Sequence, residues 1–92
     1  MPTYLVERYL PGRNRAWLEI ALARLRRQRT RAAYLGSTYV SEDDSCFCRF
    51  EAETADDVRD ANEIAGAPFA RIVVAEEIGI GQRGPAKEGD RS

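Results

Sequence analysis

The sequence predicts an α+β domain built from one four-stranded antiparallel sheet and two helices that share one of its faces. Three observations predict this class. The chain has 92 residues, which is enough for one small domain and no more. Its hydrophobic pattern follows the order strand, helix, strand, strand, helix, strand. Capping and turn residues separate these stretches, so each element has a defined beginning and end.

The first two elements are a strand and an amphipathic helix. Residues 4–10 alternate in the way that is typical of a strand, and Pro11 and Gly12 end this stretch. Asn14 is a suitable N-cap for a helix that runs to about residue 30. The apolar residues of this helix form one stripe: Leu18, Ala21, Leu22 and Leu25. The stripe predicts that the helix lies on the sheet.

The remaining elements are a hairpin, a second helix and a last strand. Residues 32–40 and 45–53 are the second and third strands, and the polar turn between them predicts an antiparallel hairpin. Thr54 begins the second helix as its N-cap, and Gly66 is the glycine expected at its C-terminal end. Residues 69–78 supply the fourth strand.

This order of elements is that of the ferredoxin-like, or split βαββαβ, sandwich. Right-handed crossovers place both helices on one face of the sheet, so the opposite face is left uncovered. Such a face must be polar, bind a ligand or pack against a second copy. Alternation along the first and third strands places these side chains on it: Leu5, Glu7, Tyr9, Phe47, Arg49 and Glu51. The pattern leaves the register of the second and fourth strands open.

The other side of the same two strands faces the helices. On the first strand alternation assigns Tyr4, Val6 and Leu10 to this side, with Arg8 at the end of the set. On the third strand it assigns Cys46, Cys48, Phe50 and Ala52. Free cysteines are among the most buried residues, which favours two small hydrophobes beneath the helices. Binding of a soft metal by the pair is the alternative.

The composition excludes several classes of function. The chain contains no histidine, which rules out Ser-His-Asp and Cys-His catalysis and every metal site that requires imidazole. Its two cysteines lack the spacing of zinc ribbons and of CxxC redox sites. No apolar stretch approaches the roughly 20 residues that span a bilayer. We therefore expect no membrane partner, reduced thiols and a cytoplasmic protein.

Nucleic acid is not an expected partner. The one basic cluster comprises Arg24, Arg26, Arg27, Arg29 and Arg31. It lies on or just after a helix rather than on the sheet, and the chain lacks the RNP1 pattern of RNA-recognition modules. The net charge of −1 also differs from the strongly basic balance of most nucleic-acid-binding domains.

Glu7 and Arg49 are the strongest candidates for a site. They lie on neighbouring strands of the predicted sheet, and they can meet on its uncovered face beside Tyr9. Such a trio can hold a polar ligand, or act as an acid/base group with an arginine that stabilises an anion. The alternative is a cross-strand ion pair within a dimer interface.

Four parts of the chain resemble, in order, a family of small bacterial domains of unknown function whose named representative is a nickel-binding ferredoxin-like protein. These parts are residues 5–12, 34–40, 42–44 with 46–52, and 61–69 with 71–73. The resemblance implies a protomer that pairs through its sheet face into a homodimer, a dimeric α+β barrel with the ligand site between sheet and partner. It also implies nickel as a possible cofactor. Members commonly carry His where this chain has Tyr9, so oxygen donors for a divalent metal would be Glu7, Glu51 and Glu76.

We therefore predict a ferredoxin-like domain over residues 1–79, followed by a disordered tail over residues 80–92. The domain is expected to be a cytoplasmic homodimer that binds a metal ion such as nickel, or a small polar ligand, without chemistry of its own. The expected ligand-binding residues are Glu7, Tyr9, Tyr34, Arg49 and Glu51.

Two other functions stay open at this point. One is a cofactor-free enzyme of the dimeric α+β-barrel kind, an oxygenase, isomerase or cyclase that acts on a small aromatic or polyketide-like substrate. In that enzyme Tyr9 and Glu7 would be the acid/base pair and Arg49 would hold an anion. The other is a structural or partner-binding module, in which the same charges serve only the interface.

Overall fold

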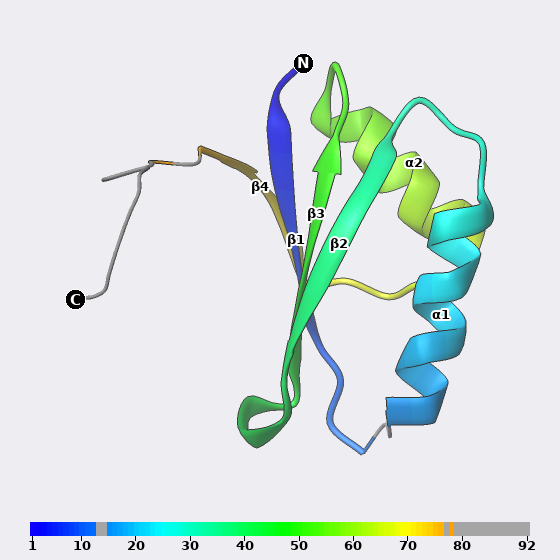
Figure 1. Ribbon diagram of the computed structural model, residues 1–92, viewed down its shortest axis with the longest axis vertical. Coiled ribbons are helices and arrows are strands. Elements are labelled where there is room, and N and C mark those ends of the chain that lie inside the picture. The colour runs from blue at the N-terminus through cyan, green and yellow to red at the C-terminus, as the bar shows by residue number, and fades with distance from the viewer. Residues whose placement is uncertain (13–14, 77, 79–92) are drawn as a thin grey trace, which may run out of the picture.

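The computed structural model describes residues 1–12, 15–76 and 78, and these contain one antiparallel sheet and two helices (Figure 1). The elements are β1 (Thr3–Tyr9), α1 (Arg15–Arg27), β2 (Ala33–Val40), the 3₁₀ helix η1 (Ser41–Asp43), β3 (Ser45–Glu51), α2 (Ala55–Ala65) and β4 (Arg71–Ala75). The strands are ordered β2-β3-β1-β4 across the sheet. Both helices lie on the same side of it (Figure 1). The predicted fold class is confirmed.

The sheet is built around β1 and β3, which are antiparallel neighbours with Leu5 opposite Arg49. The predicted hairpin between β2 and β3 is present. After η1 the chain turns at Asp44, whose φ of 50° lies in the left-handed region. The Asp44 carbonyl accepts a hydrogen bond from the Leu10 backbone N–H at 2.7 Å. This bond fastens the end of β1 to the hairpin turn.

A bulge in β2 explains why alternation left the register of this strand open. The register shifts between Tyr34 and Gly36, which makes Leu35 the extra residue. Ser37 lies opposite Cys48, and its hydroxyl donates to the Cys48 sulfur beneath the helices. Tyr34 and Ser37 therefore share one face of the sheet, although an unbroken strand would place them on opposite faces.

The strand β4 is shorter than predicted. It spans Arg71–Ala75 and not residues 69–78. Its partner β1 begins at Thr3, which lies opposite Ala75, so later residues have no strand to pair with. Phe69 lies before β4, where it packs against the core. The length of β4 is thus set by its neighbour and not by its own composition.

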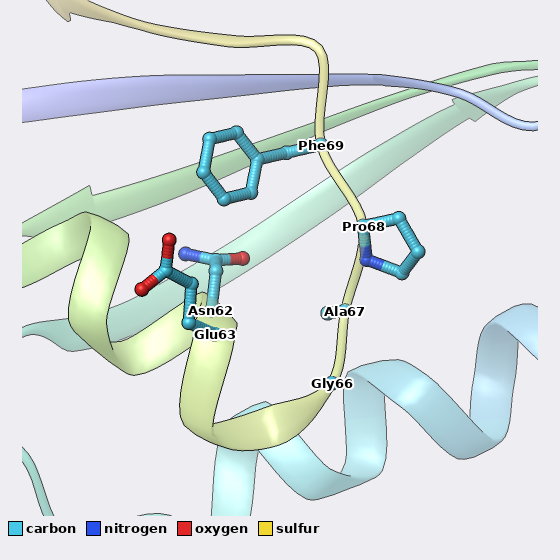
Figure 2. A pocket seen from close by; sticks show the side chains of 6 residues that line it. All are labelled: Asn62, Glu63, Gly66, Ala67, Pro68 and Phe69. Atoms are coloured by element: carbon cyan, nitrogen blue, oxygen red, sulfur yellow. The ribbon is translucent and has the colours of Figure 1, made fainter.

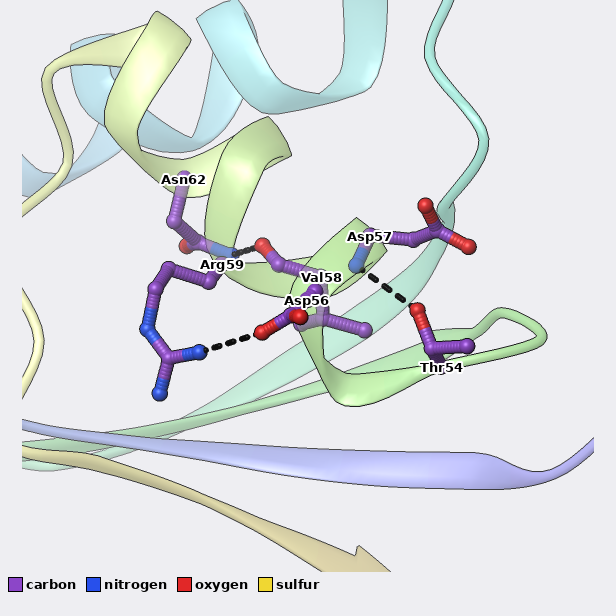
Figure 3. A network of polar contacts seen from close by, with 6 residues as sticks. All are labelled: Thr54, Asp56, Asp57, Val58, Arg59 and Asn62. Carbon is purple, nitrogen blue, oxygen red and sulfur yellow. Dashed lines mark hydrogen bonds and ion pairs between the residues drawn. The ribbon is translucent and has the colours of Figure 1, made fainter.

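The helix α2 begins and ends at the predicted capping residues. The Thr54 hydroxyl oxygen accepts a hydrogen bond from the Asp57 N–H at 3.1 Å (Figure 3). This bond satisfies one of the backbone donors that a helix start leaves free. Gly66 has a φ of 66°, and its N–H bonds to the carbonyls of Asn62 and Glu63.

The helix α1 lies with its apolar stripe on the sheet, and its buried residues are Leu18, Ala21 and Leu25. The predicted N-cap, Asn14, lies outside the described residues. The helix ends at Arg27 and not near residue 30. There the hydroxyl of Thr30 bonds to both the N–H and the carbonyl of Ala32, which gives the backbone a local alternative to the helix.

The core fills the layer between the sheet and the helices. Its largest fully buried side chains include Phe50, Val6 and Val58, and both cysteines are fully buried as predicted. Two polar side chains, Arg8 and Asn62, are also buried in this layer. Within the described residues, neither helix has the length and apolarity that crossing a membrane requires.

We expect Thr54→Ala to lower the free energy of unfolding by about 1 kcal/mol, because the Asp57 N–H loses its acceptor. Urea denaturation followed by circular dichroism measures this change. Thr54→Ser keeps the acceptor and is the matched control, which should stay within about 0.5 kcal/mol of the unaltered chain. An equal loss in both variants would show that the cap is not the cause.

Candidate functional site on the open sheet face

The face of the sheet that the helices leave uncovered, here called the open face, carries its side chains in cross-strand rows. Across β2, β3, β1 and β4 these rows are Val40, Ser45, Tyr9; then Thr38, Phe47, Glu7, Arg71; then Gly36, Arg49, Leu5, Val73; and then Ala33, Glu51, Thr3, Ala75. No other helix or strand of the described part of the chain crosses this face (Figure 1). The two middle rows therefore mix apolar side chains with three charged ones.

Glu7 is bonded to Arg71 and not to Arg49. The Arg71 Nε lies 3.0 Å from the Glu7 Oε1, and the two residues are opposite each other on β1 and β4. This hydrogen bond raises the pKa of the Arg71 guanidinium. Arg49 lies opposite Leu5, one row away from Glu7, so the predicted Glu7 to Arg49 pair does not form. The exposed pair with Arg71 contributes little to stability.

Arg49 is a half-buried cation whose guanidinium lies against Gly36. Its Nη2 is 2.8 Å from the point where a Cβ at Gly36 would stand, so the glycine provides the room for the guanidinium. Within the described part of the chain, Arg49 makes no hydrogen bond and no ion pair. A guanidinium in this state has all its donors available for an anion.

The carboxylates predicted as metal ligands are not brought together in one chain. Glu7 and Glu51 lie in separate rows, and Glu76 follows the last residue of β4. Among the described residues, no group of three or more Cys, Asp or Glu side chains is close enough to hold a metal ion. A divalent-metal site made from these carboxylates would need ligands from a second copy.

The two tyrosines of the predicted site lie on different faces. Tyr9 is on the open face with 63% of its surface exposed. Tyr34 lies on the helix side, where its ring is 5.4 Å from that of Phe50 and its hydroxyl bonds to Ser37. Burial raises the pKa of Tyr34. Tyr34 is therefore separated from the other predicted ligand-binding residues by the sheet itself.

A buried arginine is the feature that the sequence reading missed. Arg8 is only 3% exposed. Its Nη1 donates to the carbonyls of Ala67 at 3.2 Å and Pro68 at 3.1 Å, and its Nη2 donates to the Asn62 Oδ1. The available signal was alternation, which places Arg8 on the same face as the buried Val6.

The chain segment that receives Arg8 also lines a pocket of about 460 Å³ at the C-terminal end of α2. Figure 2 shows its lining residues, which are Asn62, Glu63, Gly66, Ala67, Pro68 and Phe69. The Asn62 amide donates from its Nδ2 to the Val58 carbonyl at 2.8 Å (Figure 3). Asn62 thus connects the Arg8 guanidinium to the helix backbone.

The two thiols lie next to this arginine. Their sulfurs are 3.8 Å apart, and Arg8 is directly opposite Cys46 on the neighbouring strand. The hydrogen bond from Cys46 lowers the pKa of Cys48 to about 6, and the Arg8 charge and the Ser37 hydroxyl act in the same direction against burial. The same hydrogen bond, together with burial, raises the pKa of Cys46.

Residues 4–74 match the family described as nickel responsive protein SCO4226-like. The chain belongs to this family. The matched region includes part or all of every strand and both helices. No curated protein and no solved structure matches the chain significantly.

The donors that one chain offers on the open face do not fit a nickel ion, in spite of the family's description. The chain has no histidine, and Glu7 already binds Arg71. Arg49 places a second positive charge on the same face. Within the described residues, one chain therefore presents too few donors on this face for a nickel ion.

We expect Arg8→Ala to lower the free energy of unfolding by at least about 3 kcal/mol, because the Asn62 oxygen and two buried carbonyls lose their donor. Denaturation in urea measures the change. Arg71→Ala is the matched control on the open face, where losing an exposed pair should cost no more than about 1 kcal/mol. Similar losses in both variants would contradict the role given to Arg8.

We expect one thiol of the folded chain to ionise at about pH 6, since the pKa of Cys48 falls to that value from 9.0. The folded value is below the unfolded one, so the stabilisation from Cys48 is present at high pH and is lost as the pH falls through about 6. Stability should therefore rise between about pH 6 and 9. Ultraviolet absorbance of the thiolate and urea denaturation measure both effects. Absorbance that increases only near pH 9 would contradict the prediction.

Proposed function

We propose that this protein is a non-catalytic homodimer that is joined through its open faces and binds a small carboxylate-bearing ligand at Arg49. One observation carries the proposal. The Arg49 guanidinium lies within an uncovered face beside apolar side chains, and it forms no hydrogen bond or ion pair with any other described residue. A cation in these surroundings supports an anionic ligand, because charge-assisted hydrogen bonds are strongest where water is partly excluded.

The apolar part of the open face supports pairing with a second copy. Leu5, Phe47 and Val73 are only half-buried by their own chain. A partner would remove the remaining apolar surface from water, which matters in a domain too small for a large core. The Glu7 and Arg71 pair also suits a two-fold axis, since each copy offers a carboxylate and a guanidinium to the same groups of the other.

The surroundings of Arg49 favour a carboxylate on an apolar body. A guanidinium binds a carboxylate through two parallel hydrogen bonds, a geometry that an ammonium group cannot match. Leu5 and Val73 lie in the same row as Arg49, and Phe47 lies in the next row. These side chains would contact the apolar part of the ligand.

Light scattering after size-exclusion chromatography tests pairing, and calorimetric titration with benzoate tests binding. We expect a dimer that binds benzoate, and Arg49→Gln should weaken binding by about 10- to 100-fold, which corresponds to one lost charge-assisted contact. Arg59→Gln is the matched control, because Arg59 is on α2 in an exposed pair with Asp56 at 2.9 Å. This variant should bind benzoate normally.

Two results would overturn the proposal. A strictly monomeric species at micromolar concentration would exclude the paired site. Binding of Ni²⁺ by the dimer that is lost in Glu7→Gln would replace the carboxylate ligand with a metal ion held between two copies. The enzyme alternative has no support from the pocket at the C-terminal end of α2, which is not lined by Glu7, Tyr9 or Arg49.

A further inference from the structure

The thiol pair beneath the helices is separate from the open face. Cys46 and Cys48 are both fully buried on the helix side of β3, with their sulfurs 3.8 Å apart. The Ser37 hydroxyl donates to the Cys48 sulfur at 2.9 Å. The chain has no other cysteine, so any thiol chemistry of this protein belongs to these two residues. The proposed homodimer and its ligand do not use them.

The buried charge next to the thiols is positive. Arg8 lies directly opposite Cys46, and its hydrogen bonds go to neutral acceptors, two carbonyls and the Asn62 amide. Its buried Nε has no hydrogen-bond partner within the described part of the chain. Arg8 also forms no ion pair with a described carboxylate. A buried cation without a counter-charge is costly, and the Cys48 thiolate can supply that charge, so this site is suited to one negative charge.

We propose that Cys46 and Cys48 form a two-coordinate site for a soft monovalent metal ion of the Cu⁺ class, with Arg8 as its counter-charge. On binding, both sulfurs are thiolates, any proton that they still carry passes to solvent, and each sulfur forms one bond to the metal, with no change of oxidation state. The two thiolates and the ion together carry one negative charge, which the guanidinium balances.

The geometry of the pair fits such an ion. A metal–sulfur bond is about 2.3 Å long, so two of them can span up to about 4.6 Å between sulfurs. A two-coordinate ion prefers the linear arrangement, so binding would move the sulfurs apart from the observed 3.8 Å by less than about 1 Å. Thiolates select soft ions such as Cu⁺. Ni²⁺ would need further donors, and no third Cys, Asp or Glu is close enough within the described residues.

A pocket provides a route to the thiols. It has a volume of about 270 Å³ and lies between α1 and β2, with Leu18, Leu22, Ser37 and Tyr39 among its lining residues. Ser37 belongs to this pocket and also touches the Cys48 sulfur. Ser37 therefore connects the pocket to the first sulfur, and an ion that enters here would displace its hydroxyl from the Cys48 sulfur.

The test is a titration of the full chain with Cu⁺ under anaerobic conditions, in competition with a coloured Cu⁺ chelator. We expect one Cu⁺ per chain, and a native mass spectrum in which, at a given ion charge, the added copper replaces one proton, as a monovalent ion must. Cys46→Ala and Cys48→Ala should each weaken binding by more than the roughly 100-fold that loss of an outer-shell partner costs. Circular dichroism checks that each variant is folded.

Two further measurements separate this site from the open face. Arg49→Gln should leave Cu⁺ binding unchanged, because Arg49 lies on the other side of the sheet. If the chain binds Cu⁺ but neither dimerises nor binds benzoate, the proposed function is excluded and the proposal of the Cu⁺ site stands. If the alanine variants fail to fold, the mass spectrum of the unaltered chain still decides. No copper adduct, an adduct in which copper replaces two protons as Cu²⁺ would, or unchanged affinity in folded Cys46→Ala would overturn the proposal.

Discussion

The buried guanidinium of Arg8 is the interaction on which the arrangement of this fold depends. It joins β1, in the centre of the sheet, to the chain that leaves α2, through Asn62 and the carbonyls of Ala67 and Pro68. Because a buried cation requires acceptors, this segment must turn its carbonyls inward. Shortly after, the Ala70 N–H bonds to the carbonyl of a β1 residue at 2.7 Å, and β4 begins beside β1.

Because side chains alternate along β1 and β3, the functional groups of the molecule lie on two separate faces of the sheet. On one face the helices cover a core that contains an arginine and two thiols. On the other face, arginine and glutamate side chains are set among apolar ones that their own chain leaves half-exposed. Glu7 and Arg8 are adjacent in the chain, but their side chains belong to separate sites on opposite faces of the sheet.

Much of the fold could be predicted from the sequence, because its local signals agree with one another. Thr54 and Gly66 bound α2 as expected, and alternation assigned the faces of β1 and β3 correctly. The bulge at Leu35 was not predictable from period alone, because one inserted residue reverses the facing of the rest of β2.

The details of the site were less predictable for physical reasons. Glu7 has an arginine available on each neighbouring strand, and only the register decides that Arg71 stands opposite it while Arg49 stands opposite Leu5. A single sequence does not determine such a register. Alternation predicts that Arg8 faces the helices, but it does not predict the hydrogen-bond partners of Arg8. These acceptors are an amide and two carbonyls some 54 to 60 residues away in the chain.

The two borders of the sheet differ in a way that bears on aggregation. At the outer border of β2 the bulge at Leu35 interrupts the row of backbone groups, and such irregularities hinder the addition of a foreign strand. The border of β4 is a short regular strand without proline, and its Val74 is 70% exposed. When the protein is concentrated or partly unfolded, edge-to-edge association should therefore start at β4.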